Sequence, residues 1–294
     1  MSASTDPHLR IVFVVSADQK TGTYFRYHNL AVCLQRRGHT VTVLSQASHR
    51  FGWKSETRDR VEYILAPSFP GNRWLYFSSN PMNLLYRHLR SAPEADVFHL
   101  FQPFPNAAWS WLRLRKTRRA SLFAYDWDDL LLNEHSSLLL QRTFKDLILG
   151  KLAQWTELHL PRFAHLVTAI SQELALLATK RGARWVELLH NGCLPSDPPT
   201  RAAARAQLGL KPDALYLGFT GWAAPEMDWI LNAVAKLVDE HPRLRIAFSG
   251  VHPNDVVDLS LVPGVAERID YFRFETAEEC RVLQSALDLG LLPL

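Results

Sequence analysis

Residues 11–15 read Ile-Val-Phe-Val-Val, and residues 41–44 read Val-Thr-Val-Leu. The first stretch is a continuous apolar run, typical of a buried parallel strand. Between the two, apolar residues recur at helical spacing from Tyr24 to Arg37, and Gly38 suits the position just past a helix end. This succession of strand, loop, helix and strand predicts the first unit of a doubly wound α/β sheet.

The same alternation of strands and helices continues along the chain. It predicts strands at 61–65, 97–100, 121–125, 165–170 and 186–189, and helices at 105–115, 137–160 and 172–180. A Pro-rich break at 193–200 and a short helix at 201–208 follow, and then the pattern restarts. The restarted pattern predicts strands at 215–219, 245–248 and 287–292, and helices at 229–240 and 277–286.

The sequence therefore predicts an α/β protein with one complete doubly wound domain and part of another. The first domain covers residues 1–192, a linker covers 193–212, and the incomplete second domain covers 213–294. The second domain has few strands for an open parallel sheet, which would leave an apolar edge and face uncovered. We expect that the parent domain continues beyond Leu294.

The composition excludes several classes of protein. With 47% hydrophobic and 21% charged residues, the chain is unlike disordered, collagen-like or coiled-coil proteins. Its 3 cysteines lie far apart without a CxxC pair, which argues against a zinc ribbon or a disulfide scaffold and suits a reducing cytoplasm. The sequence lacks a run of about 18 apolar residues, so it predicts no membrane span. Residues 1–10 also lack the charged-then-apolar order of a signal peptide.

Charge is distributed unevenly along the chain. Residues 1–120 hold 17 Lys and Arg against 7 Asp and Glu, whereas residues 121–294 hold 16 against 22. A basic half predicts an anionic partner. Basic residues are dense at 113–119 and mixed with aromatic ones at 73–77 and 84–90, which suits peripheral contact with an anionic membrane surface at its inner face. No nucleic-acid-binding motif accompanies them, so nucleic acid is not an expected partner; a solvated helix end is the alternative for 113–119.

Several motifs follow one another in a fixed order along the chain. They are Thr21-Gly-Thr-Tyr-Phe-Arg26, Arg37-Gly-His-Thr-Val-Thr-Val-Leu44, His190-Asn-Gly192 and Ala286-Leu-Asp-Leu-Gly-Leu-Leu-Pro293. Together they resemble glycosyltransferase family 4, whose members have the GT-B fold of two Rossmann-like domains. The resemblance implies an acceptor-side domain at 1–192 and a donor-side domain at 213–294. It also implies that a sugar moves from a nucleotide-sugar donor to a carbohydrate or lipid-linked acceptor, with retention of configuration. No cofactor is implied, because the nucleotide-sugar is a substrate.

Three residues at the start of the first predicted helix are candidates for acceptor binding. Gly22 and Thr23 follow the first strand, at the sheet edge where doubly wound folds bind ligands. Glycine lets the backbone approach a substrate closely, and the N–H groups of a helix N-terminus suit a phosphate. Arg26, one turn further on, could add a charge-assisted contact. The alternative is a tight turn at Gly22 with a solvated Arg26.

Further candidates end two of the predicted strands. His99 could bond a sugar hydroxyl or act as a base, although a core histidine is the alternative. Asp126, Asp128 and Asp129 crowd one strand end, where carboxylates could accept sugar hydroxyls, supply a base with a raised pKa or bind a divalent ion. A helix N-cap is the competing explanation. We favour sugar recognition without a metal, with His99 and Asp126 as catalytic residues and Asp128 and Asp129 as acceptor ligands.

The donor-side candidates follow from the resemblance. They are Asn191 and Gly192 at the end of the first domain, Gly250 after a later strand, and Gly221, Trp222, Glu226 and Asp228 around the first loop of the second domain. Gly221 would let a diphosphate approach, and Trp222 could stack on a ring. The alternatives are a structural turn at Asn191-Gly192 and a helix-dipole role for Glu226 and Asp228.

The sequence departs from the family pattern in its donor site. Trp222 and Met227 stand where the family usually carries an Arg and a Lys, and the family's E-x7-E segment would lie beyond Leu294. We therefore expect the chain as given to be inactive, and a non-catalytic carbohydrate- or partner-binding remnant is the alternative function. An epimerase-type enzyme would need GxxGxxG after the first strand and Tyr-x-x-x-Lys, and the sequence has neither.

Overall fold

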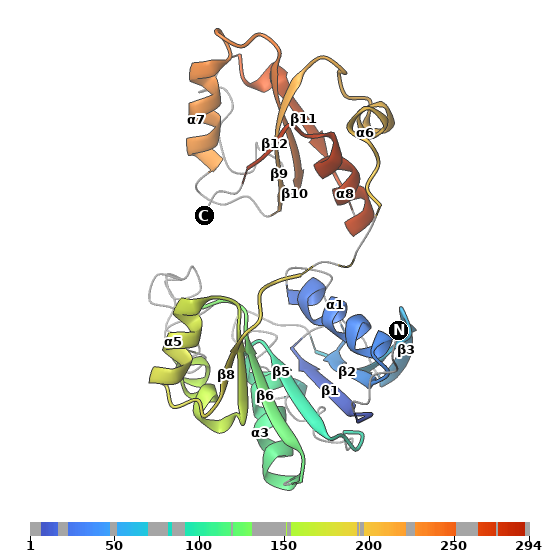
Figure 1. The fold of residues 1–294 in the computed structure, drawn as a ribbon, viewed down its shortest axis with the longest axis vertical. Helices are drawn as coiled ribbons and strands as arrows, with labels where there is room; N and C mark the ends of the chain where they lie inside the picture. Colours follow the sequence, from blue (N-terminus) through green and yellow to red (C-terminus); the bar gives the residue numbers. More distant parts are fainter. Residues whose placement is uncertain are drawn as a thin grey trace. The chain divides into compact units, whose positions relative to one another are not determined.

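The chain forms two compact units, Met1–Leu194 and Pro195–Leu294. Both contain a β-sheet of mainly parallel strands with helices packed on its faces (Figure 1). The structure is a computed structural model, and it describes residues 7–16, 23–47, 52–69, 82–83, 92–118, 120–130, 151, 154–192, 194, 197–221, 227–250, 264–274 and 276–291.

The first unit is built on one sheet, to which the described residues contribute eight strands in the order β3-β4-β2-β1-β5-β6-β7-β8. The strands are β1 (Arg10–Val15), β2 (Thr40–Gln46), β3 (Lys54–Arg58), β4 (Val61–Ala66), β5 (Val97–Phe101), β6 (Leu122–Trp127), β7 (Leu166–Ala169) and β8 (Val186–Leu188). Neighbouring strands are parallel except for β3, which pairs antiparallel to β4. All carboxyl ends of the parallel strands therefore meet at one edge of the sheet.

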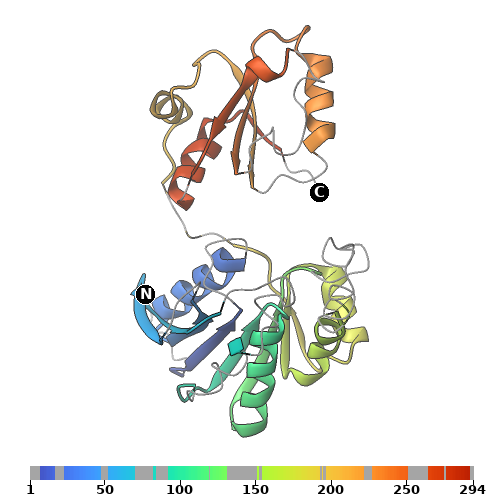
Figure 2. The same ribbon diagram turned by 180° about the vertical axis from the view of Figure 1, so that it is seen from behind.

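Helices cover both faces of this sheet (Figures 1 and 2). They are α1 (Thr23–Arg36), α3 (Pro105–Thr117), α5 (Gln172–Lys180) and the 3₁₀ turn η2 (Leu160–Phe163). In the central strand β1, Phe13 packs in the core under α1, whereas Val12 and Val14 pack in the core under α3 and α5. Because successive side chains of a strand point to opposite faces, a strand buried on both faces is apolar throughout. This arrangement explains the continuous apolar run at 11–15.

The second unit repeats this arrangement on a smaller sheet. In the described residues its strands are β9 (Leu215–Gly221), β10 (Leu244–Gly250), β11 (Ile269–Phe272) and β12 (Leu289–Gly290), in the order β11-β10-β9-β12 and all parallel. The helical segments are α6 (Arg201–Leu208), α7 (Met227–Leu237), α8 (Ala277–Ala286) and the 3₁₀ turn η5 (Ala266–Arg268). Ile246 and Phe248 of β10 pack in the core with α7, and Ala247 packs in the core with α6 and α8.

Most elements lie where the sequence predicts them. The helices predicted at 172–180, 201–208 and 277–286 coincide with α5, α6 and α8. Two strands were not predicted: β3, a charged edge strand with partly exposed residues, and β11, which is half-buried along its length. Neither has the apolar run that marks a buried strand.

Three predicted segments need separate comment. Residues 201–208, assigned from sequence to the linker 193–212, form α6, whose Ala204 is fully buried in the second unit. The aromatic and basic segments 73–77 and 84–90 lie outside the described residues, as does most of the helix predicted at 137–160. None of the helices in the described ranges combines the length and apolar character needed to cross a bilayer.

Candidate functional site

A cluster of polar side chains lies at the carboxyl edge of the first sheet, where α1 begins. Doubly wound sheets hold their ligands at this edge. The structure brings together five of the residues selected from sequence, namely Thr23, Arg26, His99, Asp126 and Asp128. Asp129 is exposed beside them, and Gly22 lies outside the described residues.

The centre of the cluster is a two-pronged ion pair between Arg26 and Asp126. Arg26 Nε and Nη2 donate to the two carboxylate oxygens at 2.6 and 2.8 Å, and both side chains are buried. Arg26 also donates to the Asn191 side chain at 2.7 Å and to the Leu189 carbonyl at 2.9 Å. Burial alone would lower the pKa of Arg26, but the hydrogen bonds and charge of Asp126 outweigh it. The pKa is therefore raised overall, and the guanidinium stays charged. Arg26 thus joins α1 to the end of β6 and to the segment after β8.

Thr168 links His99 to this ion pair. Strand register places Thr168 of β7 beside Asp126 of β6, and the Thr168 hydroxyl donates to Asp126 Oδ1. His99 Nε2 lies 3.3 Å from the same hydroxyl. Because a hydroxyl has a single proton, His99 must be the donor in this second contact. Burial lowers the pKa of His99 to about 4, despite the nearby Asp126 charge, so the imidazole is neutral near pH 7.

Asp128 has different surroundings from Asp126. It accepts a hydrogen bond from the Thr23 hydroxyl at 2.9 Å, and Gln102 Nε2 donates to that hydroxyl at 2.9 Å. Burial, together with the charge of Asp126, raises the pKa of Asp128 to about 6. Asp128 can therefore exchange a proton near neutral pH.

Sequence reasoning missed several polar residues at this edge. Gln102 and Thr168 complete the cluster, and Gln102 has a φ of 68°, a left-handed conformation that is uncommon for a residue other than glycine. Nearby, Asn106 Nδ2 donates to the Ser16 carbonyl and to Gln46 Oε1, each at 2.8 Å. The available signal was position: Ser16 directly follows the strand predicted at 11–15, and Gln102 lies two residues after the strand predicted at 97–100. Thr168 had no signal, because its partner is on another strand.

The donor-side glycines of the second unit lie at the corresponding edge of their own sheet. Gly221 and Gly250 are register partners at the carboxyl ends of β9 and β10. Their φ angles are 152° and 118°, and a Cβ added to Gly250 would lie 1.9 Å from the Gly221 carbonyl oxygen. Glycine is therefore required at Gly250 by the close approach of two backbones.

The other donor-side candidates are distributed more widely. Asn191 and Gly192 are exposed in the first unit, and Asp228 belongs to the first turn of α7. Trp222 and Glu226 lie outside the described residues. Within the described ranges, no group of three or more His, Cys, Asp and Glu side chains is arranged to hold a metal ion.

Comparison with known sequences identifies related proteins. The family model described as Glycosyltransferase Family 4 matches residues 24–195, more than half of the chain. A D-inositol 3-phosphate glycosyltransferase of Streptomyces bingchenggensis is 60% identical over 47 residues, 15% of this chain and 10% of that protein. An enzyme of the same name from Mycolicibacterium gilvum is 34% identical over 101 residues, 33% of this chain and 23% of that protein. The matched segments therefore span less than a quarter of either relative.

Solved structures show the same fold over nearly the whole chain. Anabaena HepE in complex with UDP-glucose superimposes with a TM-score of 0.60 and 16% identity, over 96% of this chain and 73% of that chain. Sucrose-phosphate synthase from Thermosynechococcus elongatus gives a TM-score of 0.69 at 16% identity, over 96% and 74% of the two chains. The predicted GT-B fold class is confirmed by this likeness together with the parallel sheets of both units.

Proposed function

The chain belongs to glycosyltransferase family 4, and on that premise we propose that it transfers a sugar from a nucleotide-sugar donor to a carbohydrate or lipid-linked acceptor, with retention of configuration. The observation that carries the proposal is the polar cluster at the carboxyl edge of the first sheet. It contains one fixed ion pair, Arg26 with Asp126, and one carboxylate of raised pKa, Asp128.

Asp128 and Thr23 receive the acceptor in this proposal. The Asp128 carboxylate accepts the proton or hydrogen bond of an acceptor hydroxyl, because its pKa of about 6 lies near the working pH. Arg26, Asp126, Thr168 and His99 act as positioning residues that hold the strand ends and α1 in place. The cluster thus supplies orientation, which lowers the entropic part of the barrier.

The donor side uses backbone rather than a metal or a cofactor. Gly221 and Gly250 add no side chain of their own at the carboxyl ends of β9 and β10, which lets a diphosphate approach the main chain there. Stabilisation of the departing diphosphate is then electrostatic. A structural neighbour is described as a complex with UDP-glucose, which makes UDP-glucose a first donor probe. Two relatives are named for D-inositol 3-phosphate, which makes inositol phosphate a first acceptor probe.

The test is a transfer assay with matched variants. The protein is incubated with UDP-glucose, other nucleotide-sugars and a panel of acceptors, and nucleoside diphosphate release and product configuration are measured. Asp128→Asn should lower kcat by roughly 100-fold, a typical effect of removing a general base. Its exposed neighbour provides the control, Asp129→Asn, which should retain the activity. Equal loss in both variants would contradict the role of Asp128.

The same assay separates this function from its alternative. If calorimetry detects sugar binding but no donor gives transfer, the result would favour a non-catalytic carbohydrate-binding protein. Trp222 and Met227, which stand where the family usually carries two cations in its donor loop, are the sequence feature that supports this alternative. Diphosphate release above the buffer background would contradict it.

We also propose peripheral contact with an anionic membrane through the basic end of α3. Arg113, Arg115 and Lys116 lie in its last two turns, followed by Arg118. Each Lys or Arg close to an anionic surface contributes about 1 kcal/mol to binding. Co-sedimentation with anionic and neutral vesicles at low and high salt tests this; equal binding to both vesicle types would contradict it.

A further inference from the structure

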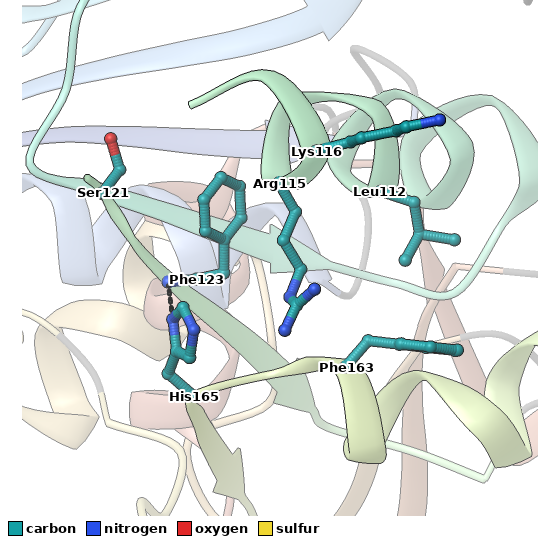
Figure 3. A pocket seen from close by; sticks show the side chains of 7 residues that line it. All are labelled: Leu112, Arg115, Lys116, Ser121, Phe123, Phe163 and His165. Atoms are coloured by element: carbon teal, nitrogen blue, oxygen red, sulfur yellow. Dashed lines mark hydrogen bonds between the residues drawn. The ribbon is translucent and has the colours of Figure 1, made fainter. Parts of the chain in front are cut away.

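A cavity lies in the first unit, at the opposite edge of the sheet from the candidate site. It has a volume of about 480 Å³ and is lined by Leu112, Arg115, Lys116, Ser121, Phe123, Phe163 and His165 (Figure 3). Ser121 directly precedes β6, and His165 directly precedes β7, so the cavity is at the amino ends of these strands. None of the seven lining residues is acidic.

Arg115 brings a charged donor into this cavity. Figure 3 shows its side chain extending from α3 into the space between Phe123 and Phe163. Its Nε is buried and has no hydrogen-bond partner in the described part of the chain. A buried donor of a charged group is costly when it has no acceptor. An anion in the cavity would supply a counter-charge to this guanidinium.

His165 adds a second donor with a fixed orientation. Its Nδ1 accepts the Phe123 backbone N–H at 3.0 Å, which is the dashed line in Figure 3. The proton of the neutral ring is therefore on Nε2, which can only donate. Burial, and then the charges of Arg115 and Arg184, lower the pKa of His165, so the ring is neutral near pH 7. The two arginines also create the positive potential that attracts an anion.

The remaining lining residues define the kind of anion. The Ser121 hydroxyl already donates to the Ala95 carbonyl at 2.6 Å, whereas Leu112, Phe123 and Phe163 provide apolar walls. Forked guanidinium donors match the oxygens of a phosphate, and the volume exceeds that of a bare phosphate ion. We propose that this cavity binds a phosphate monoester, with Arg115 and His165 Nε2 on the phosphate and the attached organic group against the phenylalanine rings.

Calorimetric titration with inorganic phosphate, phenyl phosphate and phenol tests the proposal. Phenyl phosphate should bind more tightly than inorganic phosphate, because its ring buries apolar surface, and phenol should not bind. Arg115→Gln should weaken phenyl phosphate binding roughly tenfold, since it removes the charged fork. The control is Arg113→Gln, an equal charge change two residues away on the same helix outside the cavity lining, which should alter binding by less than about twofold. Equal weakening by both variants would overturn the proposal and indicate nonspecific attraction.

A lipid headgroup and a free metabolite would present the same phosphate. Vesicles of phosphatidic acid in phosphatidylcholine, compared with phosphatidylcholine alone, separate these sources. Binding to phosphatidic acid vesicles that Arg115→Gln abolishes and Arg113→Gln retains, without phenyl phosphate binding, assigns the site to a lipid headgroup. Phenyl phosphate binding without vesicle binding assigns it to a free phosphate ester. Binding to neither probe overturns the proposal.

A measurement on the unsubstituted protein guards against a variant that fails to fold. The ring nitrogens of His165 are followed by ¹H–¹⁵N NMR during titration with phenyl phosphate. The Nε2 resonance should move in proportion to occupancy. The resonances of His28, a residue of α1 that is hydrogen-bonded to Tyr63 and Asp59, should stay unchanged. An unmoved His165 ring at a ligand concentration that saturates the calorimetric signal overturns the site.

Discussion

Arg26 and Asp126, 100 residues apart in sequence, form a buried pair in which two guanidinium nitrogens meet two carboxylate oxygens at 2.6 and 2.8 Å. Their side chains are 7% and 0% exposed. The pair fixes the first turn of α1 against the end of β6, at the edge where doubly wound sheets bind ligands. Neither charge can be removed alone without leaving the other uncompensated in the interior.

We predict that Arg26→Gln lowers the free energy of unfolding of the first unit by about 3 kcal/mol, because Asp126 would remain as a buried, unpaired charge. Urea denaturation followed by tryptophan fluorescence measures the loss. Arg10→Gln is the control, since Arg10 forms exposed ion pairs with Glu94 and Asp96; its unfolding midpoint should stay nearly unchanged. Similar midpoints for the two variants would contradict a buried pair.

The hydroxyl of Thr168 should matter for stability beyond its size. Thr168→Val keeps the shape of the side chain but leaves Asp126 Oδ1 and His99 Nε2 without their shared partner. We predict a loss of about 1–2 kcal/mol in the free energy of unfolding. Thr179→Val on the exposed side of α5 removes a hydroxyl that donates to the Ala175 carbonyl of its own helix, and it should change stability little. The prediction is wrong if both substitutions have the same effect.

Asp128 should make stability depend on pH in a defined direction. Its pKa is about 6 in the folded protein and 3.8 as the ordinary value, so the folded state holds the proton more tightly. The stabilisation by this proton is complete below pH 4 and is lost as pH rises through 6. We predict that Asp128→Asn raises Tm relative to the unsubstituted protein above pH 7 and leaves it unchanged near pH 4. Asp129→Asn, at an exposed site, should show no such trend; a flat difference for Asp128→Asn would refute the raised pKa.

Gly250 is predicted to tolerate no side chain. Gly250→Ala would place a Cβ 1.9 Å from the Gly221 carbonyl oxygen at a φ of 118°, so we expect a loss of about 3 kcal/mol from the second unit through overpacking and backbone strain. Gly264→Ala shares the positive φ but meets nothing within 4 Å, and it should cost about 1 kcal/mol. Hydrogen exchange of β9 and β10 amides reports the difference, and equal protection in the two variants would count against the close backbone approach.

The sequence determined the elements of this protein and much of their order. Apolar runs such as 11–15 and helical spacing such as 172–180 are local signals. A strand buried on both faces is apolar at consecutive residues, and a helix buried along one stripe is apolar at every third or fourth residue. Strand-end positions also indicated Thr23, His99 and Asp126 as candidates, because parallel strands present their carboxyl ends at one edge. The edge strand β3 was not predicted from the sequence, because it forms by pairing with β4 and has no apolar run.

Only the tertiary structure decided which of these polar residues meet and with what effect. Thr168 reaches Asp126 because β7 lies beside β6 in register, and Gln102 reaches Asp128 through Thr23 of α1. The same contacts give two nearby carboxylates different partners. Asp126 forms a buried ion pair with Arg26, whereas burial raises the pKa of Asp128. Such differences depend on strand order, burial and distances between segments far apart in the chain. These quantities arise when the sheet assembles, and no local sequence pattern encodes them.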